Sequence, residues 1–134
     1  MTTVGALREA LETKDTEAAT TLLADDVVFR SPAVHTPYDG KVATSVILHA
    51  VARVFEDFRY TRVVSTGDDH VLVFEARVGD LDVEGVDLLH LDAAGLVDDF
   101  RVMIRPLKAL HAVVDAMGRE IPTVMRELGL SQDG

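Results

Sequence analysis

Asp87 is the residue of this sequence whose surroundings point most clearly to chemistry. It lies in the middle of a predicted strand over 82–91, where alternation places it on the same face as Leu89 and Leu91. A carboxylate on an apolar face is costly unless it is paired, hydrogen-bonded or protonated. A carboxyl group that keeps its proton near neutral pH can act as a general acid or donate a hydrogen bond to a ligand carbonyl. The other interpretation is a structural aspartate bonded to a neighbouring strand or loop.

A second group of polar residues lies in the loop over 32–40, which contains two prolines and closes with Asp-Gly. Loops over pockets often carry function. His35 titrates near neutral pH and could act as a base, and Tyr38 could bring a hydroxyl group to a ligand. The competing interpretation makes His35 a surface residue and packs Tyr38 under the loop.

The sequence contains no motif for a metal or a cofactor. It has no cysteine, and its five histidines show no spacing typical of metal ligands. Asp25 and Asp26 resemble a metal-binding pair, but we interpret them as the end of a helix. Glycine-rich phosphate loops are also absent from the sequence. We therefore expect neither a metal nor a cofactor.

Charge and hydropathy exclude two classes of partner. The formal net charge is −10, and no cluster of Lys and Arg with interleaved aromatic residues is found, so we expect no binding to nucleic acid. Apolar runs fall far short of the roughly 20 residues that a membrane helix needs. The first residues do not form a secretory signal. The expectation is a cytoplasmic protein without a membrane partner.

The elements that must position these residues follow from hydrophobic periodicity and turn signals. Thr3 and Asp15 can cap the first two helices, and Asp25 with Asp26 ends the second. The predicted helices cover 3–12, 16–24 and 41–56, and a helical region covers 106–130, in which Gly118 ends one helix and Pro122 opens a short one over 122–128. The predicted strands cover 27–31, 58–65, 70–78, 82–91 and 96–104. Consecutive hairpins make the sheet mainly antiparallel, with the helices on one face.

The chain is predicted to form one domain over 1–134, with a core over about 4–105 and a helical extension over about 106–130. The apolar stripe of the extension could close a pocket as a lid or pack on a partner subunit, and we favour the partner slightly. Core and pocket are expected to share an apolar lining. Its predicted members are Phe29, Ile47, Val51, Phe55, Phe74, Leu89, Phe100, Val102 and Ile104.

Three landmarks in this order of elements resemble the nuclear transport factor 2-like superfamily. They are the junction Ala24–Val27, the loop from Pro32 to Gly40 before a helix, and Val86-Asp87 followed by the turn over 92–95. Within that superfamily the chain is most similar to SnoaL-type polyketide cyclases and ketosteroid isomerases. The resemblance implies an α+β fold in which a cone-shaped, curved, mainly antiparallel sheet wraps around the N-terminal and central helices. It also implies a homodimer, which in this superfamily often forms through the outer face of the sheet.

The resemblance carries over one catalytic role of three from the ketosteroid isomerases. The position of their aspartate base is Ser31 here, and the position of their oxyanion tyrosine is Leu7. Only the protonated aspartate has a match, at Asp87, so a steroid isomerase of that mechanism is not expected. The aspartate–histidine pair of the SnoaL-like cyclases is not assembled either, because His90 lies on the strand face opposite Asp87.

These observations predict a SnoaL-like protein that binds a small, mostly apolar molecule in the cone pocket. Asp87 would be the principal acid–base group, helped by Ser31 and Tyr38, in an isomerisation, cyclisation or hydration. The alternative is a non-catalytic ligand-binding or homodimerisation module of the same fold. The sequence leaves open whether the protein is an enzyme.

Overall fold

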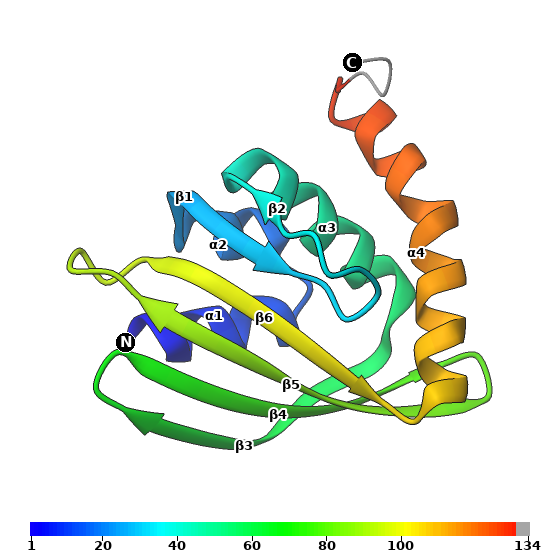
Figure 1. Cartoon of the computed structure of the whole chain (residues 1–134), viewed down its shortest axis with the longest axis horizontal. Helices are drawn as coiled ribbons and strands as arrows, with labels where there is room; N and C mark the ends of the chain where they lie inside the picture. Colours follow the sequence, from blue (N-terminus) through cyan, green and yellow to red (C-terminus); the bar gives the residue numbers. More distant parts are fainter. Residues whose placement is uncertain (131–134) are drawn as a thin grey trace.

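Six strands form one curved sheet in the computed structural model, which describes residues 1–130 (Figure 1). The strand order is β2-β1-β6-β5-β4-β3, and every neighbouring pair is antiparallel except β1 and β6. The strands are β1 (Leu23–Arg30), β2 (Tyr38–Asp39), β3 (Glu56–Thr66), β4 (Asp69–Val78), β5 (Leu81–Leu91) and β6 (Val97–Arg105). The helices are α1 (Thr3–Glu12), α2 (Thr16–Thr21), α3 (Lys41–Val54) and α4 (Leu107–Glu127). The predicted α+β fold with a mainly antiparallel sheet is confirmed; residues 131–134 of the predicted domain lie outside the described residues.

The short N-terminal helices are fixed by side-chain caps. Asp15 accepts a hydrogen bond from the backbone N–H of Ala18 and caps α2, as predicted. The cap of α1 is Thr2 rather than Thr3, because Thr2 accepts from the N–H of Gly5. Thr3 is the first helical residue, and its hydroxyl donates to the carbonyl of Gly95, which ties α1 to the turn before β6.

The junction between α2 and β1 lies earlier than the sequence predicts. The helix ends at Thr21 and the strand begins at Leu23, so Asp25 and Asp26 are exposed residues of an irregular strand and do not end the helix. Leu23 is fully buried and pairs with Val97 of β6, and the register shifts between Leu23 and Val28. Backbone pairing with β6 and burial of Leu23 thus outweigh the local helical pattern.

The C-terminal region is one continuous helix, so the predicted break at Gly118 and the separate helix from Pro122 are wrong. Both residues lie inside α4, at the i and i+4 positions. Contacts with α3 account for the continuity: Val124 packs against Val46 and Ala50, and Arg53 of α3 forms an ion pair with Glu127. This packing outweighs the low helix propensities of glycine and proline. None of the helices in the described residues is long and apolar enough to cross a membrane.

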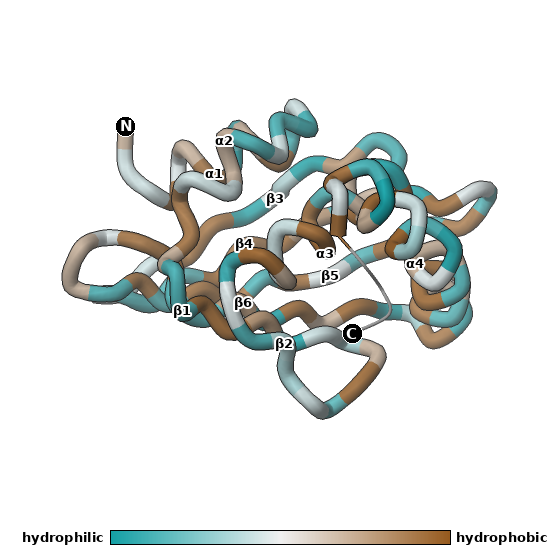
Figure 2. The backbone as a smooth tube through the Cα atoms, turned by 90° about the horizontal axis from the view of Figure 1, so that it is seen from above, coloured by the Kyte–Doolittle hydropathy of each residue, from teal (hydrophilic) through white to brown (hydrophobic). Residues whose placement is uncertain are grey.

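The hydrophobic core lies between the concave face of the sheet and the helices α1 to α3, with Ala109 and Val113 of α4 completing it. Figure 2 shows the alternation of hydrophobic and hydrophilic residues along the strands that places one face of each inward. The largest fully buried side chains are Phe74, Phe100, Leu7, Leu23 and Leu72. Gly85 of β5 leaves room for the ring of Phe74 on β4, since a Cβ at Gly85 would lie 2.3 Å from that ring. The core is therefore packed closely around the strands that carry the candidate site.

Candidate functional site

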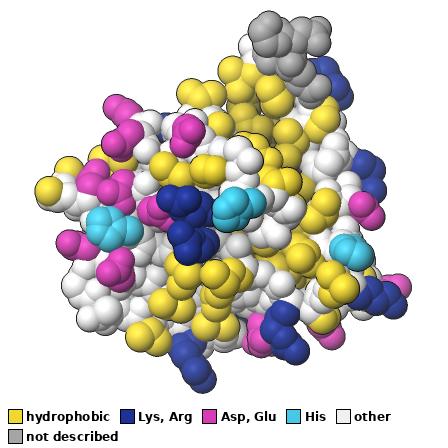
Figure 3. Space-filling model, viewed as in Figure 1, with side chains coloured by type: hydrophobic (Ala, Val, Ile, Leu, Met, Phe, Trp, Pro, Cys, Tyr) yellow, Lys and Arg dark blue, Asp and Glu magenta, His cyan; other side chains and the backbone are white. Residues whose placement is uncertain are grey.

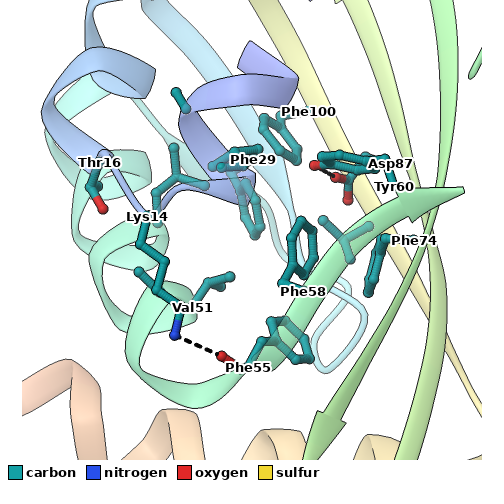
Figure 4. Close-up of a pocket in the computed structure, with 15 residues that line it drawn as sticks. Lys14, Thr16, Phe29, Val51, Phe55, Phe58, Tyr60, Phe74, Asp87 and Phe100 are labelled. Atoms are coloured by element: carbon teal, nitrogen blue, oxygen red, sulfur yellow. Dashed lines mark hydrogen bonds between the residues drawn. The ribbon is translucent and has the colours of Figure 1, made fainter. Parts of the chain in front are cut away.

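A buried tyrosine–aspartate pair lies on the concave face of the sheet. The hydroxyl group of Tyr60 donates a hydrogen bond of 2.6 Å to Oδ2 of Asp87 (Figure 4). Both residues are 4% exposed. Asp87 is one of two polar residues that are buried within the described part of the chain, together with Thr44.

Strand pairing and helix α1 position the two side chains. Asp87 of β5 lies opposite Leu72 of β4 and Val102 of β6, so it shares their inward face. Tyr60 lies in β3 between two shifts of register with β4. Helix α1 holds this irregular segment: Glu12 accepts a 2.9 Å hydrogen bond from the N–H of Tyr60, and Arg8 donates one of 3.0 Å to its carbonyl.

Burial controls the protonation of both groups. Loss of solvation raises the pKa of Asp87 to about 7, and the hydrogen bond from Tyr60 opposes this by stabilising the ionised carboxylate. Burial also raises the pKa of Tyr60 well above its usual value of 10, with the charge of Asp87 adding to the effect. Near neutral pH Asp87 therefore exists in both protonation states, whereas Tyr60 keeps its proton. A carboxyl group in this state can donate or accept a proton.

The pair faces a small apolar space, here called the inner cavity, of about 50 Å³. No protein group donates to Oδ1 of Asp87 among the described residues, and no buried side-chain oxygen or nitrogen there lacks a partner, so Oδ1 is not sealed in the core. Lys14 and Thr16 lie at the opposite end of the cavity (Figure 4), where Lys14 donates to the carbonyl of Phe55. The lining is Ala10, Leu11, Lys14, Thr16, Phe29, Leu48, Val51, Ala52, Phe55, Phe58, Tyr60, Phe74, Asp87, Phe100 and Val102.

A second space adjoins the inner cavity and has a volume of about 250 Å³. It lies between the sheet, α3, the loop after β1 and helix α4, and is called here the α4 chamber. Four residues line both spaces: Phe29, Val51, Phe55 and Val102. The remaining lining of the α4 chamber is Ser31, Pro32, Ala33, Val34, Tyr38, Ile47, Ile104, Val113, Val114, Met117, Gly118 and Ile121.

The structure separates the predicted acid–base residues into different spaces. Asp87 lines the inner cavity, whereas Ser31 and Tyr38 line the α4 chamber. The hydroxyl of Ser31 accepts a 2.9 Å hydrogen bond from the N–H of Ala33, which makes it part of the turn after β1. His35 is exposed and borders a surface groove with Arg30 and Arg101. This groove adjoins the α4 chamber, with which it shares Ser31, Pro32, Val34, Val102 and Ile104.

Most of the predicted lining residues do surround these spaces. Phe29, Val51, Phe55, Phe74, Phe100 and Val102 line the inner cavity, and Ile47 and Ile104 line the α4 chamber. Leu89 is the exception and lines neither of the two. It pairs with His70 and Phe100 and is buried in the core cluster.

Sequence reasoning missed Tyr60. A signal was available in the sequence. Tyr60 shares one face of the predicted strand with Phe58, and a buried tyrosine hydroxyl requires a hydrogen-bond partner. Asp87 also required one. His90, which strand alternation places on the opposite face from Asp87, is exposed there and bonds Asp98 at 2.6 Å. Within residues 1–130 no cluster of three or more His, Asp or Glu side chains could hold a metal ion.

Comparison with known proteins gives matches over most of the chain. An uncharacterized protein with a cystatin-like fold from Silicibacter pomeroyi is 37% identical, with a TM-score of 0.89 over 95% of this chain and 90% of that protein. A steroid delta-isomerase from Pseudomonas aeruginosa is 38% identical, with a TM-score of 0.87 over 92% of each chain. An epoxide hydrolase/cyclase-like enzyme of pyran ring formation in salinomycin shares the fold at 13% identity, with a TM-score of 0.66 over 80% of this chain and 90% of that enzyme. No curated protein sequence matches.

The family follows from the sequence as well as from the fold. The SnoaL-like domain family matches residues 4–100, the part of the chain that carries Tyr60, Asp87 and all but the last part of the sheet. The matches to the two relatives near 40% identity extend into α4, because their alignments span more than nine-tenths of the chain. The chain therefore belongs to the SnoaL-like family of the nuclear transport factor 2-like superfamily.

Proposed function

We propose that this protein binds a small, mostly apolar carbonyl compound beside Asp87 and exchanges a proton with it. One observation carries the proposal: the Tyr60–Asp87 pair is buried, and Oδ1 of Asp87 is left to a cavity whose other walls are almost entirely apolar. A pocket of this kind, with few polar groups and a carboxyl group of raised pKa, is typical of a binding or catalytic site.

The chemistry is a proton transfer at the carbon next to the carbonyl group. In its ionised form Asp87 removes that proton: the C–H bond breaks, an O–H bond forms on Asp87, and the electron pair moves to the carbonyl oxygen as an enolate. Where the ligand has a C=C bond next to that carbon, return of the proton to the far end of the conjugated enolate shifts the double bond and completes an isomerisation. Attack of the enolate carbon on an electrophilic carbon of the same ligand would give a cyclisation. Tyr60 occupies Oδ2 and so directs Oδ1 toward the ligand. The hydroxyls of Ser31 and Tyr38 line the adjoining chamber and not the inner cavity, so neither is assigned to the developing oxyanion.

The named relative supports the class of reaction but not the same set of residues. The Pseudomonas aeruginosa protein is called a steroid delta-isomerase, and such isomerisations proceed by proton transfer. In this chain Leu7 is a fully buried core residue and Ser31 is held in a turn, so neither replaces a tyrosine donor or an aspartate base. The proposed reaction therefore depends on the single carboxyl group of Asp87.

Exchange of hydrogen for deuterium in a bound ketone tests the proposal without knowledge of the natural substrate. Small unbranched ketones, butanone among them, are incubated with the protein in heavy water, and NMR follows loss of the proton next to the carbonyl. We expect exchange to rise with pH through about 7, where Asp87 ionises, and to fall by about 10²- to 10⁴-fold in Asp87→Asn. His90→Asn is the matched control on the opposite face and should leave the rate unchanged.

A second variant separates the role of Tyr60 from that of a structural residue. Tyr60→Phe removes the hydrogen bond that stabilises ionised Asp87, so the pKa of Asp87 rises further and the midpoint of the rate profile moves upward by about one pH unit. A merely structural role would lower the rate without moving the midpoint. Ketones that bind the wild-type protein without any exchange, or exchange that persists in Asp87→Asn, would refute the catalytic proposal.

A non-catalytic module of the same fold is the second candidate, and one observation favours it. Apart from Asp87, no titratable group that could complete an acid–base pair within hydrogen-bond reach faces the inner cavity in the described residues, since Tyr60 retains its proton and Lys14 lies at the far end. Ligand binding with no proton exchange would support this function, with a homodimer through the outer face of the sheet as its assembly.

A further inference from the structure

We propose that the ligand is elongated: its carbonyl end lies at Asp87, and an unbranched apolar tail extends into the α4 chamber. This inference rests on the proposed function for the carbonyl end alone. It assigns helix α4 and the loop after β1 to the binding site, and it names the substrate class as an alkyl or acyl carbonyl compound.

The inner cavity alone is too small to hold a whole ligand of the proposed kind. The inner cavity holds about 50 Å³, whereas an apolar core cavity known to bind benzene has about 150 Å³. A small carbonyl group with a few carbon atoms is thus the most that the inner cavity admits. The α4 chamber, at about 250 Å³, offers the larger part of the space that a ligand could occupy.

The two spaces adjoin along β6, where they share a wall. Its inward residues are Phe100 on the inner cavity, Val102 on both spaces and Ile104 on the α4 chamber, and each step of two residues advances about 6–7 Å. Asp87 lies directly opposite Val102, so the carboxyl group is on the inner-cavity side of this shared wall. A ligand whose carbonyl lies at Asp87 therefore extends naturally toward Ile104 and α4.

The α4 chamber has the lining that an apolar tail requires. Its polar side chains are the hydroxyls of Ser31 and Tyr38, and no charged residue lines it among those described. Val113, Met117 and Ile121 of α4 form one wall at helical spacing. The helix is held in place outside the chamber by the ion pairs of Arg53 with Glu120 and Glu127.

The chamber opens to solvent between α4 and the loop after β1. Val34 on the loop is 48% exposed and Val114 on the helix is 38% exposed, so apolar side chains form both edges of the opening. Gly118 also lies at this edge, and a Cβ built there would meet no atom within 4 Å. Figure 3 shows hydrophobic side chains gathered beside α4 on the face turned to the viewer. The tail can therefore reach the chamber without displacing α4.

A series of unbranched methyl ketones tests the inference by calorimetry on the full chain. We expect the dissociation constant to fall about fourfold for each added methylene, which corresponds to about 0.8 kcal/mol, until the chamber is full. Gly118→Phe places a ring at the opening and should weaken binding of long ketones by at least about tenfold while leaving short ketones unchanged. Asp115→Ala is the matched control on the exposed side of α4, outside the lining of both spaces, and should bind both as the wild type does. Should Gly118→Phe fail to fold, Val114→Trp at the same edge replaces it.

Each outcome decides one of the two proposals. If short ketones bind in a way that requires Asp87, and added methylenes do not increase the affinity, the proposal of an elongated ligand is refuted and the proposed function stands. Long ketones unaffected by both Gly118→Phe and Val114→Trp would lead to the same conclusion. Unbranched alcohols that show the same gain in affinity per methylene as the ketones, in both the wild type and Asp87→Asn, would support binding of the tail in the α4 chamber. That result would also refute the contact of a carbonyl group with Asp87. Failure of every long chain to bind, with a changed particle mass in Gly118→Phe, would assign the opening to a second copy of the chain.

Discussion

At the scale of single residues, the free energy of Asp87 depends on the balance between burial and one hydrogen bond. The side chain lies almost entirely out of water, and an ionised carboxylate there loses its solvation. The 2.6 Å hydrogen bond from Tyr60 recovers only part of that loss, because the pKa of Asp87 still lies far above that of an exposed aspartate. Asp87 therefore lowers the stability of the folded protein whenever it is ionised.

Asp87 should make the stability of the protein fall as pH rises. The pKa of the group is 3.8 in the unfolded chain and about 7 in the folded protein, so between these values the folded state holds the extra proton. The stabilisation by this proton is fully present below about pH 4 and is lost by about pH 7. We expect Asp87→Asn to be more stable than the wild type by about 4 kcal/mol at about pH 8, and much closer to it at about pH 4, in urea unfolding. Equal pH slopes for the two proteins would contradict a buried, titrating Asp87.

The sequence predicted Asp87 but not its partner, for a physical reason. Strand alternation is a local property, and it placed Asp87 on the apolar face without knowledge of the rest of the fold. The contact with Tyr60 joins residues that are 27 positions apart and depends on the register of β3, which shifts on both sides of Tyr60. Such shifts depend on contacts with α1, through Glu12 and Arg8, and leave no local pattern in the strand.

At the scale of elements, substitution of two glycines by alanine tests the packing of β5 and α4. A Cβ at Gly85 would lie 2.3 Å from the ring of Phe74 and 2.6 Å from the carbonyl oxygen of Met103, so Gly85→Ala should destabilise the fold by about 1–3 kcal/mol or more. Gly118→Ala meets no atom within 4 Å in α4 and should stabilise the fold by about 0.5–1 kcal/mol. Thermal unfolding of both variants gives the comparison. A shift of the same sign in the two variants would mean that β5 or α4 is not packed as described.

Elements bounded by turns were predictable, and elements decided by tertiary contacts were not. The strands β4, β5 and β6 begin and end within a residue of their predicted limits, because Gly-Asp and Asp-Ala-Ala-Gly turns delimit them. The α2–β1 junction and the continuity of α4 depend on pairing with β6 and packing on α3, which no local window contains. For the same reason the α4 chamber could not be predicted: the sequence shows the apolar stripe of α4 but not what it faces.

At the scale of the whole molecule, the outer face of the sheet carries a strip of apolar residues between charged ones. Val71 lies opposite Leu88 and Val73 opposite Val86, which in turn lies opposite Met103. Ion pairs such as Arg59–Glu75 and Arg105–Glu84 border the strip. An apolar centre with a charged rim is the usual composition of a protein interface, and it supports the proposed homodimer through this face. The net charge of −10 on each copy means that added salt should favour the dimer.

Met103→Glu should convert the proposed homodimer into a monomer. Met103 is 49% exposed on the outer face beside Val86, and a carboxylate there would be buried without a partner in the interface of both copies. Light scattering should show the particle mass fall by half, while circular dichroism shows an unchanged fold. Val42→Glu is the matched control, because Val42 is 65% exposed in the first turn of α3, away from the sheet, where an acidic residue is favourable. Dimers in both variants, or a wild-type monomer, would show that the outer face of the sheet is not the interface.

Contacts between copies would then have to come from α4. The structure packs the apolar stripe of this helix largely on α3 and the chamber, so the contact would use its exposed residues Leu107, Val114 and Leu128.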